Sequence, residues 1–107
     1  MIARLWHGVT ESSKSEEYLH YLSKTGVKDY QATPGIRGVY VLRRTEDQKA
    51  HFLILTFWES KDAIADFAGP DIDQARYYAA DKEYLLELEE TVTHYEVLVD
   101  SQPSEEI

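Results

Sequence analysis

The stretch "FLILTFWESKDAIADFAG", residues 52–69, decides the fold. Its first seven residues are almost all apolar and end at Trp58, which is typical of a buried strand. Ser60 follows at once as a good helix N-cap, and Gly69-Pro70 then ends the helix. The stretch therefore predicts a strand over 51–58 joined almost directly to a helix whose apolar face carries Ala63, Ile64 and Phe67.

The rest of the chain supplies the partners of this strand. We predict strands over 2–10, 36–44 and 91–99, because these runs are rich in β-branched and aromatic residues. Helical spacing of apolar residues predicts a helix over 13–31, begun by a Ser13–Glu16 capping box, and a second helical run over 71–88.

The predicted order of elements is β-α-β-β-α-β. This split βαβ order predicts an α+β, ferredoxin-like domain, a four-stranded antiparallel sheet with its helices on one face. We place that domain at residues 1–100 and a polar carboxy-terminal tail at 101–107.

The strand over 51–58 is apolar on both faces. Helices can cover only one face of the sheet, and the other would leave an apolar patch too large for a monomer to expose. We therefore expect a homodimer packed sheet to sheet. Because successive side chains of a strand point to opposite faces, one face carries His51, Leu53, Leu55 and Phe57. The other face carries Phe52, Ile54, Thr56 and Trp58.

Composition narrows the class of protein. The 107 residues carry a net charge of −9, which disfavours nucleic acid and anionic membrane partners. The absence of cysteine excludes disulfides and Cys-ligated zinc. The first ten residues lack the pattern of a signal peptide, and no apolar run approaches a bilayer span. We expect a soluble cytoplasmic protein.

The junction Trp58-Glu59-Ser60, the helix "KDAIADF" and the turn and strand "TPGIRGVYVLRR" resemble the antibiotic biosynthesis monooxygenase (ABM) family of dimeric α+β barrels. The resemblance covers roughly residues 2–99. It implies that Trp58 packs beneath the following helix as a core residue. It also implies a site between sheet and helices, where relatives oxygenate aromatic polyketides or quinols without metal or flavin, or degrade haem.

Two features separate this chain from known branches of the family. The resemblance implies a functional asparagine, yet the chain contains none. The tryptophan position of the haem branch corresponds to Phe67, and its haem-ligand histidine to Tyr77 or Arg76. Haem degradation is therefore disfavoured, and we predict no cofactor.

Strand parity predicts where the site residues meet. Arg4 and Trp6 share one face of the first strand, and His94 lies on the less apolar face of the last. In a ferredoxin-like order these strands are neighbours. An arginine beside a histidine of near-neutral pKa suits a planar, acidic phenol or quinol. We assign catalysis to His94 and Arg4, and substrate binding to Trp6, Thr56, Phe67, Arg76, Tyr77 and Tyr78.

Alternatives remain for these residues. His94 can be a structural histidine bonded to backbone, Arg4 can pair with Glu96 across the strands, and Trp6 can be core or dimer interface. The four histidines are widely spaced, and alternation separates His7 from His94, so we predict no metal site.

Two functional classes remain open, an ABM-like oxygenase and a non-catalytic barrel that binds a small ligand or serves as a scaffold. A wide cleft lined by Arg4, His94 and a tyrosine favours the first. An interface filled by Trp6, Phe67 and Tyr77 favours the second.

Overall fold

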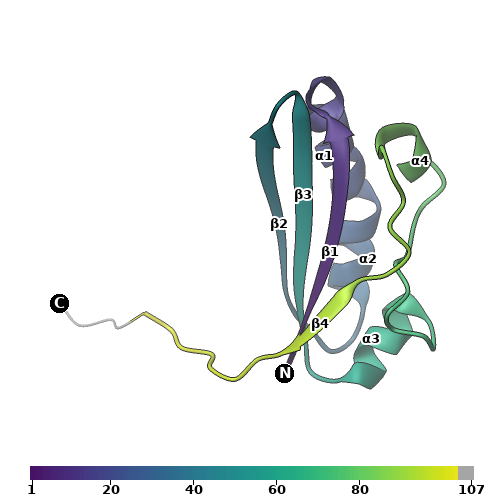
Figure 1. Cartoon of the computed structure of the whole chain (residues 1–107). Helices are drawn as coiled ribbons and strands as arrows, with labels where there is room; N and C mark the ends of the chain where they lie inside the picture. The colour runs from purple at the N-terminus through teal and green to yellow at the C-terminus, as the bar shows by residue number, and fades with distance from the viewer. Residues whose placement is uncertain (104–107) are drawn as a thin grey trace.

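The computed structural model describes residues 1–103 and shows one antiparallel sheet with helices on one of its faces (Figure 1). The strand order is β2-β3-β1-β4, so the α+β ferredoxin-like fold predicted from the sequence is confirmed. The strands are β1 Ile2–Glu11, β2 Ile36–Glu46, β3 Lys49–Trp58 and β4 Thr93–Glu96. The helices are the short 3₁₀ turn η1 Ser12–Lys14, then α1 Ser15–Lys24, α2 Gly26–Ala32, α3 Lys61–Ala68 and α4 Asp81–Tyr84.

β3 lies in the middle of the sheet, because it pairs with β1 on one side and β2 on the other. Its even-numbered residues are buried against the helices and its odd-numbered ones are half-exposed, apart from the exposed Lys49, as the alternation predicts. Trp58 is fully buried. Its ring lies 5.9 Å from that of Phe67 on α3, and its Nε1 donates to the Thr56 hydroxyl at 2.8 Å. The prediction that Trp58 is a core residue is confirmed.

Two local signals in the sequence form as predicted. Ser60 caps α3, since its hydroxyl accepts from the Ala63 N–H at 3.2 Å, and Gly69 ends the helix with φ of 94°. The β2–β3 hairpin turns at Asp47 and Gln48, whose φ angles of 51° and 65° are both left-handed. Such a turn matches the twist of the paired strands and extends β2 beyond its predicted end at residue 44.

The helix predicted over 13–31 is interrupted, and its predicted capping box is wrong. The backbone at Thr25, with φ −113° and ψ −92°, divides the helix into α1 and α2. No side chain caps the start of α1, because Ser13 lies inside η1. The buried Ser15 hydroxyl instead accepts from Arg43 on β2 at 2.8 Å.

The helical run predicted over 71–88 is also wrong, since only α4 forms there. Backbone groups of this segment bond to a distant part of the chain: Ala75 N–H donates to Glu90 at 2.9 Å, and Val92 N–H donates to Asp73 at 2.9 Å. A helix would have needed the same groups. We call residues 70–92 the connecting segment.

Tyrosine hydroxyls attach the connecting segment to the rest of the domain. Tyr18 donates to Asp81 at 3.1 Å, and Tyr21 accepts from the Ala80 N–H at 3.1 Å. Near its end, Leu86 N–H donates to the Val9 carbonyl at 2.9 Å, so the segment lies along the edge of β1.

β4 is shorter than the strand predicted over 91–99. Beyond it, Val97 N–H donates to the Met1 carbonyl at 3.0 Å, and the chain then extends away from the body (Figure 1). Of the predicted tail, residues 104–107 lie outside the described part of the chain. Among residues 1–103, no helix has the length and apolarity to cross a bilayer.

Candidate functional site

Arg4 is buried between the sheet and the helices, with 1% of its surface exposed. Its Nη1 donates to the Tyr30 hydroxyl at 3.1 Å and its Nη2 to the Gln74 carbonyl at 3.3 Å. The guanidinium carbon also lies 5.5 Å from the centre of the Phe67 ring. Neutral dipoles and a ring face therefore surround this cation.

Arg4 forms no ion pair with any residue in the described part of the chain. The alternative in which it pairs with Glu96 is wrong, because Glu96 lies opposite Ile2 in the register and Arg4 lies opposite His94. Its Nε is buried without a hydrogen-bond partner. A buried cation without an ion-pair partner is costly, and Arg4 Nε adds an unpaired donor to that cost.

His94 faces Arg4 across the β1–β4 pair. Its Nδ1 lies 3.0 Å from a carboxylate oxygen of Asp73, so the alternative of a bond to backbone is wrong. Because an ionised carboxylate only accepts, Asp73 favours the tautomer with the proton on Nδ1. His94 Nε2 is then the basic nitrogen, and it is buried without a partner.

The pKa of His94 is lowered from its usual value. Burial is the main cause, the Asp73 hydrogen bond opposes it, and the charge of Arg4 adds to the lowering. The imidazole is therefore neutral at physiological pH and able to accept a proton.

Thr56 lies opposite Arg4 on the other side of β1. It is fully buried, and its hydroxyl is engaged in structure: it donates to the Arg4 carbonyl at 3.4 Å and accepts from Trp58. Arg4, His94 and Thr56 therefore lie side by side on the same face of three adjacent strands, as the alternation of side chains predicts. Only Arg4 and His94 keep polar atoms without a hydrogen-bond partner.

Phe67 and Arg76 close one side of this region. Phe67 stacks on Tyr30 with ring centres 4.2 Å apart, and the Arg76 guanidinium lies 4.8 Å from the Phe67 ring. Arg76 also donates to the Phe67 carbonyl at 2.9 Å and pairs with Asp29 at 3.2 Å.

Tyr77 and Tyr78 point in different directions, as expected for adjacent residues. Tyr77 packs edge-on against Trp6 at 6.3 Å and donates to the Glu89 carbonyl at 2.5 Å. Tyr78 donates to Asp29 and lies beside Arg76. Burial raises the pKa of both hydroxyls, so both are protonated donors at neutral pH.

The space left between sheet and helices is small. A cavity of about 20 Å³ remains, room for about one water. Its walls include Trp6, Tyr18, Tyr30, Phe67, Arg76 and Tyr78. The interface is therefore filled as it stands, and a larger molecule enters only if side chains move.

Sequence reasoning missed Tyr30, Asp73 and Gln74. Tyr30 lay in the apolar stripe of the first predicted helix, and its hydroxyl received no role. Asp73 and Gln74 lay in the helical run that does not form. Their signal was the stretch "GPDIDQ", whose Gly-Pro and closely spaced aspartates are typical of a loop.

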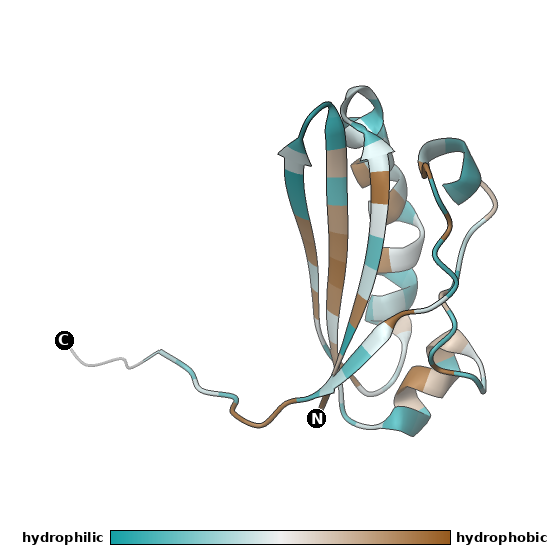
Figure 2. Cartoon of the chain, in the orientation of Figure 1, coloured by the Kyte–Doolittle hydropathy of each residue, from teal (hydrophilic) through white to brown (hydrophobic). Residues whose placement is uncertain are grey.

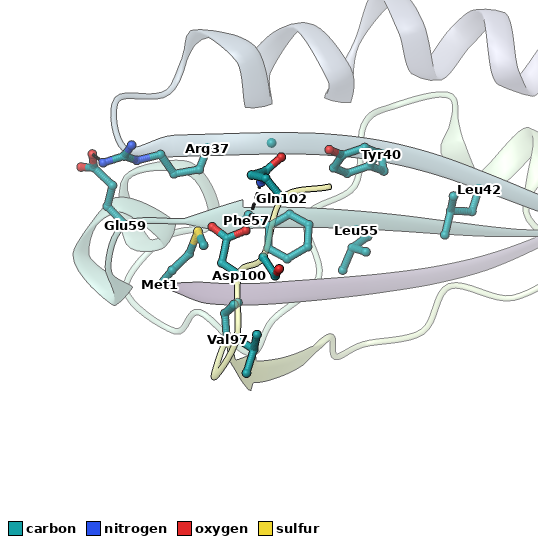
Figure 3. A pocket seen from close by; sticks show the side chains of 13 residues that line it. Met1, Arg37, Tyr40, Leu42, Leu55, Phe57, Glu59, Val97, Asp100 and Gln102 are labelled. Carbon is teal, nitrogen blue, oxygen red and sulfur yellow. Dashed lines mark hydrogen bonds and ion pairs between the residues drawn. The ribbon is translucent and has the colours of Figure 1, made fainter. Parts of the chain in front are cut away.

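The opposite face of the sheet is open. It holds a wide hollow of about 960 Å³ whose floor includes Leu55 and Phe57 of β3 and Tyr40 of β2 (Figure 3). Hydrophobic residues run along the middle of β3 (Figure 2). Large apolar side chains on and beside this face are exposed, among them Tyr40 at 56%, Leu42 at 45% and Tyr95 at 56%. We call this surface the open face.

No protein-family model matches the chain, and no curated protein matches it significantly. Solved structures do match its fold. A candidate antibiotic biosynthesis monooxygenase from Nitrosomonas europaea aligns with a TM-score of 0.67 and 12% identity, over 92% of this chain and 100% of its own. A second candidate monooxygenase, from Bacillus cereus, gives 0.64 and 13% identity, over 95% and 97%.

A haem degrader also shares the fold. MhuD from Mycobacterium tuberculosis, with two haems bound in its active site, aligns with a TM-score of 0.64 and 19% identity, over 95% of this chain and 100% of its own. At such identities the likeness concerns backbone architecture alone. On that evidence, the chain has the fold of the antibiotic biosynthesis monooxygenases and of their haem-degrading relative.

Proposed function

We propose that Arg4 and His94 form the site of a cofactor-independent monooxygenase that acts on a small acidic aromatic molecule such as an anthrone or quinol. One observation carries the proposal. Two buried nitrogens, Arg4 Nε and His94 Nε2, face one side of adjacent strands without hydrogen-bond partners. Buried polar groups are nearly always paired, so two such neighbouring orphans support a ligand site here.

The two residues supply complementary chemistry. His94 Nε2 accepts the acidic proton of the substrate while Asp73 holds the ring by Nδ1. Arg4 donates a hydrogen bond to the oxygen on which negative charge develops. With an anthrone, the resulting carbanion reacts with O₂: the methylene carbon becomes a carbonyl with one oxygen atom, and the other leaves as water with the two methylene hydrogens.

The named activity of the structural neighbours agrees with this proposal. Haem is a different matter, although MhuD binds it. The resemblance to the haem branch puts Phe67 at its tryptophan position and Arg76 or Tyr77 at its histidine position, which disfavours haem. We therefore propose no haem chemistry for this chain.

Entry of a substrate requires movement of the connecting segment. Gln74 and Arg76 of that segment contact Arg4 and Phe67, and so cover the region. Each of these two hydrogen bonds joins an arginine side chain to a backbone carbonyl, and a ligand oxygen can replace that carbonyl as the acceptor. The filled interior also favours a second candidate function, a non-catalytic barrel whose sheet–helix interface is only a core.

Oxygen uptake decides between the two candidates. The purified chain is given a panel of anthrones and quinols, and uptake is recorded with an oxygen electrode. His94→Gln should reduce turnover by about 10²–10⁴-fold, the usual contribution of a general base. Asp73→Asn should change the pH profile of turnover, because it acts by positioning His94. His20→Gln, on the exposed side of α1, is the matched control. Absence of uptake and of binding across the panel leaves the non-catalytic barrel.

We also propose that two copies associate through the open face. Tyr40, Leu42 and Tyr95 project from a surface that no helix covers. A second copy presents the same apolar surface, and closed two-fold pairing covers both at once.

A further inference from the structure

Two histidines meet at the polar end of the open face. His7 on β1 and His51 on β3 are diagonal neighbours, since His7 lies opposite Leu53 and His51 lies opposite Val9. Their rings are nearly parallel, with an interplanar angle of 19° and centres 5.6 Å apart. His7 Nε2 lies 3.3 Å from His51 Nδ1.

Glu89 binds the other nitrogen of His7. Its carboxylate contacts His7 Nδ1, and its own backbone carbonyl accepts from the Tyr77 hydroxyl at 2.5 Å. The end of the connecting segment is thus fixed against β1, with the Glu89 side chain toward His7. An ionised carboxylate on Nδ1 places the proton there and leaves Nε2 as a free electron pair facing His51.

We propose that His7 and His51 form a binding site for a divalent transition-metal ion, of which Zn²⁺ is the reference, with Glu89 as the residue that orients His7. A metal-bound histidine usually donates its second ring N–H to a carboxylate, and the Glu89–His7 pair already has this arrangement.

The separation of the nitrogens fits a shared metal. Two imidazole nitrogens at about 2.0–2.1 Å from a tetrahedral ion are about 3.3–3.4 Å apart, the separation seen here. The same separation also allows a direct N–H···N hydrogen bond, so the titrations below decide between that bond and a shared ion.

The number and type of the available ligands determine which metals the site favours. In residues 1–103 no three His, Cys, Asp or Glu side chains converge on one ion, so the protein supplies two ligands and water the remainder. In a single chain the His7 side chain is 36% exposed, which leaves room for that water. Imidazole ligands favour Zn²⁺, Cu²⁺ and Ni²⁺ over Mg²⁺ or Ca²⁺. Arg44 lies opposite His51, but it pairs with Glu46.

The first test is calorimetric titration of the full chain with Zn²⁺ at pH 7.5. We expect saturation at one ion per chain. His51→Gln should weaken binding at least tenfold, and Glu89→Gln should weaken it by about 10–100-fold, the usual effect of losing an orienting carboxylate. His20→Gln is the matched histidine control and should leave binding unchanged. Circular dichroism checks that each variant is folded.

The second test needs no variant. Cu²⁺ added to the unaltered protein should give an electron paramagnetic resonance spectrum with coupling to two imidazole nitrogens. Absence of saturable Zn²⁺ binding at millimolar concentration would overturn the proposal. So would equal losses in His20→Gln and His51→Gln, or a copper spectrum with one coupled nitrogen. None of these measurements depends on the oxygenase activity or on the site at Arg4.

Discussion

Replacement of Arg4 by methionine separates a ligand-binding arginine from a structural one. Methionine keeps most of the length and apolar bulk of the side chain and removes the charge. We expect Arg4→Met to abolish binding of a phenolic ligand while the free energy of unfolding changes little or rises.

The expected stability follows from two opposing contributions. The substitution removes hydrogen bonds to Tyr30 and Gln74, which are worth about 1.5–3 kcal/mol each when the donor is charged. It also removes the desolvation cost of a cation that is 1% exposed, several kcal/mol for an ion without a partner. The net change in unfolding free energy should lie between about −1 and +3 kcal/mol, whereas loss of one member of a buried ion pair costs about 3–5 kcal/mol.

Urea denaturation followed by circular dichroism measures this change, and isothermal calorimetry with a phenol measures binding. Tyr30→Phe is the matched control, because it removes the hydroxyl that Arg4 contacts and keeps the cation. A loss of more than about 3 kcal/mol in Arg4→Met, with phenol binding intact, would refute the reasoning and make Arg4 a structural residue.

Three further predictions follow from other parts of the molecule. Sedimentation equilibrium at micromolar concentration should show a homodimer that Tyr40→Glu converts to monomer, because the exposed Tyr40 lies on the open face; a monomeric unaltered chain would contradict this. The unfolding free energy should fall as pH drops below about 6.5, because the pKa of His94 is lowered in the folded state and the unfolded chain takes up the proton first. Urea midpoints measured between pH 7.5 and 5 should therefore depend less on pH in His94→Gln than in the unaltered chain. Titration with haemin, followed by its absorption band, should show no saturable complex of one haem per subunit. A complex that is lost in His94→Gln would reverse that conclusion.

The strands, and the position of Arg4 opposite His94, were predictable from the sequence. Both depend on the alternation of side chains between the two faces of a strand, which repeats every two residues. Alternation along β3 assigns its faces, and parity along β1 and β4 then places Arg4 and His94 together. These are local patterns, and the sheet register preserves them.

The connecting segment was not predictable in the same way. Its apolar residues have helical spacing, yet the backbone of residues 73–75 bonds to residues 90–92 at its other end, a pairing that a local pattern does not reveal. Asp73 therefore stayed out of the predicted site, although it holds His94. His7 and His51 were recognisable as residues of neighbouring strands, but the close approach of their nitrogens along a diagonal requires the register of β1 on β3.

The tyrosine contacts of the connecting segment bear on its local stability. Tyr18 and Tyr21 bind it by single hydroxyl groups and Val9 by one backbone hydrogen bond to Leu86, while β1 and β3 share a ten-residue ladder. Contacts of this kind open with less free energy than a central sheet does. We therefore expect the segment to open more readily than the sheet. Its amides would then exchange with solvent long before those of β3, and each opening would give the solvent a route to Arg4.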